Sequence, residues 1–163
     1  MSAAPAATRF VGTSVKRVED DRILSGRGRY IDDIRLPQML HGVFLRSSIA
    51  HGRLTGVDVE AALELEGVVA VITAAELEGV VHPLATRPDV PDVAKPVFTA
   101  LASDRVRHVG DPIALILAET RYQAEDARDA IVVDYEPLET VASIEEAEDP
   151  ARPSLFDDTD SNL

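Results

Sequence analysis

The sequence predicts an α+β fold in which two short capped helices pack on a mixed sheet. The first observation is an apolar run at residues 112–119, which has the length of a buried strand and is too short for a membrane span. The second is a helical pattern that follows it directly. The third is that residues 58–73 repeat the order of capped helix and β-branched strand seen at residues 120–135. Each such unit needs a sheet to pack on.

The helix after the apolar run has a clear start signal. Thr120 is a good N-cap residue, and Gln123 three positions later completes the pattern of a capping box. We expect a helix over Tyr122–Ala130, because the small residues Ala124 and Ala127 recur at helical spacing while charged residues point elsewhere. Alanines on the buried stripe would let this helix approach the sheet closely.

The remaining predicted elements are shorter. Asp58 is expected to cap a helix over residues 59–66, which Gly67 ends. The predicted buried strands are Val68–Thr73, Ile113–Ala118 and Ile131–Tyr135, with a further strand at Leu40–Arg46. A helical turn is expected at Ala74–Leu77 and a short acidic helix at Ser143–Glu148.

Composition limits the function of the chain. Its 163 residues, 45% of them hydrophobic, suffice for one globular domain with a core. The absence of cysteine excludes disulfides, a thiolate zinc site, an iron–sulfur site and a cysteine nucleophile held by this chain. A net charge of −13 would repel nucleic acids and anionic membranes. The same charge is typical of an acidic surface that only keeps a protein soluble.

The sequence also carries information on location. The first ten residues, MSAAPAATRF, lack the basic region and apolar core of a secretory signal. No apolar stretch is long enough to span a bilayer. We therefore expect a cytoplasmic protein with neither nucleic-acid nor membrane partners.

Spaced motifs run along most of the chain. L-x-G-x-G-x-Y-x-D-D spans Leu24–Asp33, and the next strand and loop carry Leu40, Phe44, Arg46, Ser47, Ala50 and His51. V-x-x-V-G-x-P-I-A spans Val106–Ala114, A-E-T follows at Ala118–Thr120, and V-x-Y-E-P-L spans Val133–Leu138. Together they resemble the large subunit of molybdenum hydroxylases, the family of xanthine dehydrogenase, aldehyde oxidase and carbon monoxide dehydrogenase. The resemblance is to the N-terminal α/β-hammerhead domain of that subunit.

The resemblance implies a domain organisation and a chemical setting. It divides the chain into an extended N-terminal arm (residues 1–28), the hammerhead domain (29–148) and an acidic linker (149–163) toward a catalytic domain that this chain lacks. The implied parent is a molybdopterin-dependent oxidoreductase acting on an aldehyde, an N-heterocycle or carbon monoxide. Molybdenum–molybdopterin dinucleotide would lie in the rest of the large subunit. Iron–sulfur clusters of the 2Fe–2S type and FAD would lie in partner domains or subunits. This chain itself would bind no cofactor.

No catalytic, cofactor-binding or metal-binding residue is assigned from the sequence. H-E-x-x-H, G-x-S-x-G and phosphate-binding loop motifs are absent. Asp32-Asp33 could be a paired carboxylate for acid–base work, or could cap a loop and form an ion pair. The residues expected to face a partner are Arg17, Arg27, Arg29, Tyr30, Arg46 and His51. The arginines could equally belong to a solvated arm, and His51 could serve as a structural hydrogen-bonding group.

Two functional hypotheses follow. The leading one is a structural domain of a molybdenum hydroxylase large subunit that is not catalytic by itself. The alternative is a free-standing acidic scaffold or assembly module that has the same fold and no catalysis. A reading frame that continues into molybdopterin-binding domains would favour the first hypothesis, and the absence of one would favour the second.

Overall fold

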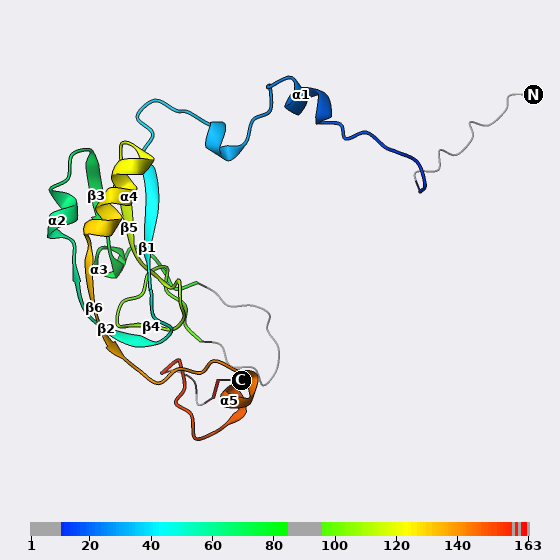
Figure 1. Cartoon of the computed structure of the whole chain (residues 1–163). Helices are drawn as coiled ribbons and strands as arrows, with labels where there is room; N and C mark the ends of the chain where they lie inside the picture. Colours follow the sequence, from blue (N-terminus) through cyan, green and yellow to red (C-terminus); the bar gives the residue numbers. More distant parts are fainter. Residues whose placement is uncertain (1–10, 85–95, 158, 160, 163) are drawn as a thin grey trace, which may run out of the picture. The chain divides into compact units, whose positions relative to one another are not determined.

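The computed structural model describes residues 11–84, 96–157, 159 and 161–162, and it divides into two compact units, Met1–Pro37 and Gln38–Leu163. In the first unit, the described residues form a short helix α1 (Asp20–Leu24) and a 3-10 turn η1 (Ile31–Asp33) (Figure 1). None of residues 11–37 is buried. This segment therefore has no core of its own among its described residues.

The second unit contains two three-stranded sheets. The first has the order β1-β5-β3, formed by His41–Arg46, Pro112–Ala118 and Val68–Ile72. The second has the order β4-β2-β6, formed by Arg105–Val106, Gly52–Asp58 and Val132–Pro137 (Figure 1). β2 was not among the predicted strands, because two glycines weaken its pattern.

All strand pairs in both sheets are antiparallel, so the prediction of one mixed sheet was wrong although the α+β class is confirmed. The reason lies in the connections. Helix α2 (Glu60–Leu63) leads from β2 in the second sheet to β3 in the first, and α4 (Arg121–Ala130) leads from β5 in the first sheet to β6 in the second. A helical crossover makes two strands parallel only when both return to the same sheet.

Helix α4 begins where the sequence predicted it. The Thr120 hydroxyl oxygen accepts a hydrogen bond from the Gln123 backbone N–H at 3.3 Å, which confirms the N-cap. The reciprocal half of a capping box is not formed, since the Gln123 side-chain oxygen accepts from the Thr120 hydroxyl at 2.8 Å instead. The cap thus consists of one hydrogen bond between the two side chains and one from the backbone of Gln123 to Thr120.

The shorter helices differ more from expectation. The Asp58 carboxylate accepts from the Glu60 N–H at 3.0 Å, but the N-cap residue of α2 is Val59 rather than Asp58, and α2 ends at Leu63 rather than near residue 66. Gly67 then turns the chain with φ +82°, a conformation that glycine adopts without strain. Two further short helices, α3 (Ala74–Leu77) and α5 (Ile144–Glu148), lie where the sequence placed them. In the described part of the chain every helix is too short or too polar for a membrane span.

The main core lies between α4 and the first sheet. Ala124 and Ala127 of α4 are fully buried, and they belong to one cluster with the alternate β5 residues Ala114, Ile116 and Ala118. A second cluster of Ala102, Val106 and Ile113 packs against partly buried residues of β2 and β6. β5 therefore contributes to both cores, which explains its continuous apolar sequence in part.

Strand β6 corrects one detail of the prediction. A buried strand was expected over Ile131–Tyr135. Ile131 is buried, but it is the C-cap residue of α4, and β6 begins at Val132, which is 58% exposed. Val133 and Tyr135 pack against the second core, while Asp134 between them faces outward. β6 is an edge strand with one face on the core, so only alternate side chains are covered.

Candidate functional site

The loop between β1 and β2 is held firmly by the turn before β5. The Ser47 N–H donates to the Asp111 carbonyl oxygen at 2.8 Å, and the Gly110 N–H donates to the Ser47 carbonyl oxygen at 2.8 Å. The Arg46 guanidinium donates to the Gly110 carbonyl oxygen at 2.9 Å and lies 5.2 Å from the centre of the Phe44 ring. Arg46 is exposed, so it is fixed in position and still available at the surface.

His51, at the end of this loop, is only 4% exposed. Its Nδ1 lies 2.6 Å from the carbonyl oxygen of Glu139. Because a carbonyl oxygen only accepts, Nδ1 carries the hydrogen and donates it. Nε2 is buried and has no hydrogen-bond partner among the described residues. The imidazole thus ties the loop to the segment after β6, which is the structural role that the sequence left open.

The predicted partner-facing residues of the N-terminal unit lie at the surface of that unit. Arg17 and Arg27 form ion pairs with Asp20 at 3.1 Å and Asp21 at 3.2 Å. These pairs are local in sequence and exposed, so they contribute little stability. Arg29 is exposed as well.

Tyr30 and Asp33 shape the turn η1. The Tyr30 side chain is exposed, and the Tyr30 backbone N–H donates to the Asp33 carboxylate at 2.9 Å. Asp33 therefore caps this turn, which is one of the two roles that the sequence left open for Asp32-Asp33, the other being acid–base chemistry.

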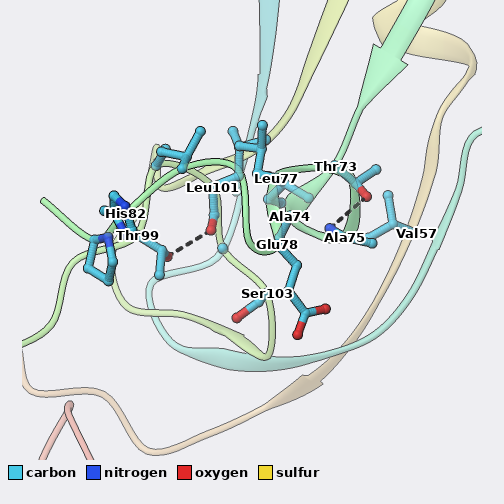
Figure 2. A pocket seen from close by; sticks show the side chains of 15 residues that line it. Val57, Thr73, Ala74, Ala75, Leu77, Glu78, His82, Thr99, Leu101 and Ser103 are labelled. Carbon is cyan, nitrogen blue, oxygen red and sulfur yellow. Dashed lines mark hydrogen bonds between the residues drawn. The ribbon is translucent and has the colours of Figure 1, made fainter.

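An open cavity of about 540 Å³ lies beside α3 in the second unit (Figure 2). Its apolar lining includes Val57, Leu77, Val81, Leu101 and Ile113. The sequence carries no local signal for this pocket, because its walls come from four separate segments. A pocket of this size and lining accommodates an apolar group.

The polar groups at the pocket do not form a catalytic set. The Thr99 hydroxyl donates to the Leu101 carbonyl oxygen at 2.8 Å, and the Thr73 hydroxyl oxygen accepts from the Ala75 N–H at 3.3 Å. In Figure 2 the His82 side chain lies apart from those of Glu78 and Ser103. Among the described residues no hydrogen bond joins these three, so no oriented nucleophile and base are present there.

Thr73 and Glu76 form a capping box at the start of α3. The Glu76 carboxylate accepts from the Thr73 hydroxyl at 2.6 Å and from the Thr73 backbone N–H at 2.7 Å. These bonds, the hydroxyl bond first, hold the pKa of Glu76 below its ordinary value. The T-x-x-E pattern of residues 73–76 is a sequence signal that could have predicted this cap.

The described residues do not fit a metal or cluster site. The chain has no cysteine, and the described part contains no group of three or more His, Asp or Glu side chains placed to hold a metal ion.

The segment after α5 packs on the domain through arginines and one aromatic ring. The Arg107 side chain donates to the Leu155 carbonyl oxygen at 3.0 Å and lies 5.0 Å from the centre of the Phe156 ring. Phe156 also meets Phe98 edge to face, with ring centres 5.0 Å apart at 66°. Arg105 pairs with Asp157 at 3.0 Å. Residues 155–157 are thus fixed to β4 and its flanks.

Comparison with known proteins identifies the chain. The family model described as "Aldehyde oxidase and xanthine dehydrogenase, a/b hammerhead domain" matches residues 25–139. The carbon monoxide dehydrogenase large chain of Afipia carboxidovorans is 41% identical over 148 residues, which are 91% of this chain and 18% of that protein. The nicotine 6-hydroxylase large subunit of Paenarthrobacter nicotinovorans is 39% identical over 137 residues, 84% of this chain and 17% of that protein.

Solved structures agree. Quinoline 2-oxidoreductase from Pseudomonas putida 86 superimposes with a TM-score of 0.80 at 41% identity, covering 88% of this chain and 18% of that one. The Cu,Mo-CO dehydrogenase gives a TM-score of 0.76 at 40% identity, covering 87% of this chain and 17% of that one. The chain spans less than a fifth of the length of these relatives. It belongs to the aldehyde oxidase and xanthine dehydrogenase family of oxidoreductases, as its a/b hammerhead domain.

Proposed function

We propose that this chain is a structural domain of a molybdenum hydroxylase large subunit and carries no active site of its own. The observation that supports this most strongly is the family match over residues 25–139, together with relatives of which the chain covers only 17–18%. A domain of this kind contributes packing and positioning to a larger enzyme. The alternative of a free-standing acidic scaffold is not favoured by these relatives.

The proposal includes cofactors and location. Relatives carry names such as "large molybdopterin subunit" and "molybdenum-binding subunit". By extension, a molybdenum–molybdopterin dinucleotide would be held by catalytic domains outside this chain. Iron–sulfur clusters and FAD would be held by partner domains or subunits, and the assembly would be cytoplasmic. The substrate would be an aldehyde, an N-heterocycle or carbon monoxide; the relatives are named for nicotine, carbon monoxide, xanthine and quinoline.

The proposed partner-facing regions are the N-terminal arm and the β1–β2 loop. The arm carries Arg17 and Arg27 at its surface, and Arg29 and Tyr30 follow it directly, with exposed apolar residues between these side chains. In the loop, Arg46 is exposed, whereas His51 is buried and would act by holding the loop in shape. Charged and aromatic side chains on an otherwise acidic chain suit contact with a partner surface.

Co-expression tests the proposal. The chain, tagged, is produced together with a separate molybdenum-binding polypeptide that carries the remaining domains of a related large subunit. The purified complex is assayed for molybdenum, iron and flavin and for hydroxylase activity. We expect co-purification, with metal and activity only in the complex. Stoichiometric molybdenum, iron or flavin on the isolated chain would refute the division of roles. A failure to associate would favour the scaffold alternative.

A further inference from the structure

The sequence of β5 indicates that both faces of this strand pack against other groups. Strands of antiparallel sheets with one solvated face alternate apolar and polar residues, whereas β5 reads PIALILA and is apolar throughout. Helix α4 covers the face that carries Ala114, Ile116 and Ala118. Ile113 on the opposite face is covered by the second core. Further along that opposite face, Leu115 and Leu117 belong to neither core cluster.

The strand register places more apolar groups beside these leucines. Leu115 pairs with Phe44 of β1 on one side and with Ile72 of β3 on the other. Leu117 pairs with Gly42 and Ala70 in the next row. We call these six residues the outer face. Phe44 is 42% exposed, and the leucines and Ile72 are half-buried.

The chemistry of the outer face suits a protein partner. Gly42 carries no side chain, and a Cβ there would lie 3.3 Å from a Leu115 methyl group, so the two leucine side chains fill the space over this glycine. Arg46 is held above the Phe44 ring by its bond to Gly110. Aromatic residues and arginines are enriched in protein–protein interfaces, and an exposed apolar patch that carries both is typical of a docking surface.

We propose that the outer face is the surface on which the remaining polypeptide of the large subunit docks, with an apolar patch on Phe44 and Leu115 and a carboxylate beside Arg46. This inference rests on the proposed function and adds the contact surface to it. The relatives are more than five times longer than the segment matched here, so a covering chain exists in them. A second copy fits less well, because each copy carries a net charge of −13.

The test compares two charge insertions on exposed strand residues. Phe44→Glu places a carboxylate in the outer face, whereas Val132→Glu places one on β6, where the side chain is 58% exposed and outside that face. Binding of each variant to the molybdenum-binding polypeptide is measured by titration, after circular dichroism confirms folding. We expect Phe44→Glu to weaken binding about tenfold or more, and Val132→Glu to leave it unchanged.

Hydroxyl-radical footprinting of the unmodified chain gives a readout that does not depend on the variants. Oxidation of Phe44 and Leu115 should fall when the complex forms, while oxidation of Val132 should not. Normal binding by Phe44→Glu with no protection of Phe44 would overturn the inference and leave the proposed function standing. Failure of the unmodified chain to bind at all would overturn both.

Two other occupants have distinct signatures. A dimer of the isolated chain in sedimentation velocity, lost in Phe44→Glu, would assign the face to a second copy. Protection of Phe44 in the isolated monomer that disappears when residues 1–28 are deleted would assign it to the chain's own N-terminal segment. Either result would overturn docking of the remaining subunit at this face.

Discussion

The N-terminal segment (residues 11–37) and the C-terminal segment (residues 149–157) look alike in sequence, since both are polar and charged. Their contacts differ sharply. The ion pairs of Arg17 and Arg27 reach only three and six residues along the chain, and these side chains are 82% and 69% exposed. Arg105 and Arg107 are 13% and 20% exposed, and Arg107 bonds to a carbonyl group 48 residues away.

The difference teaches what fixes a polar segment to a domain. Exposed ion pairs contribute little to the free energy of folding, because water screens the charges and forming the pair orders long side chains. A partly buried arginine can lie on an aromatic ring and donate to a backbone carbonyl oxygen. Such an arginine stabilises the fold more, because the ring excludes water from the contact. Phe156 supplies that ring in the C-terminal segment, while Tyr30 in the N-terminal segment is 65% exposed.

The largest expected effect is therefore that of Phe156→Ala. It removes the contacts to Phe98 and Arg107 and should lower the free energy of unfolding by about 2 kcal/mol, below the cost of truncating a fully buried phenylalanine because the ring is half-buried. Urea unfolding provides the measurement. Tyr30→Ala is the matched control and should leave the midpoint unchanged. Equal effects of the two variants would break the comparison.

A smaller effect is expected at the helix caps. Thr120→Ala removes the bond to the Gln123 N–H and should cost about 1 kcal/mol. The N-cap of α1 is Glu19, whose side chain makes no cap bond, so Glu19→Ala should change stability by less than about 0.5 kcal/mol. Thermal unfolding of both variants checks this. An unchanged midpoint for Thr120→Ala would mean that the cap does not stabilise α4.

Capping by carboxylates occurs in both units, and acid titration isolates its contribution at α3. The pKa of Glu76 is lowered in the folded state by its bonds to Thr73, so this carboxylate stabilises the fold above its unfolded pKa, and the gain is lost as pH falls through the folded pKa. The stability advantage of the unmodified chain over Glu76→Gln should shrink as the pH falls below the ordinary pKa of a glutamate and through the lower pKa of the folded state. Glu78→Gln, which alters no cap bond, is the control. A pH-independent difference would contradict this assignment.

The smallest effect on stability is expected for removal of residues 1–28. None of the described residues in this stretch is buried, so urea unfolding of the shortened chain should match that of the full chain. Association with the molybdenum-binding polypeptide should weaken, if the arm faces that partner as proposed. Unfolding of the shortened domain would show that the arm belongs to the core and would erase the contrast between the two segments.

The candidate site was only partly accessible from sequence. Arg46 was singled out by its motif and is exposed, whereas the same motif could not tell that His51 is buried against Glu139. The outer face had a signal in the doubly apolar sequence of β5. Its neighbours Phe44 and Ile72 could not be added, because strand register joins residues more than forty positions from one another along the chain.

Local physics made α4 and β5 predictable from the sequence alone. Capping at Thr120, the alanine stripe and the apolar run act between residues a few positions apart, and the structure confirms each of them. Tertiary structure decided the division into two antiparallel sheets and the docking of Phe156 on Arg107. Those choices depend on which distant surfaces bury the most apolar area together, and no short stretch of sequence encodes that sum.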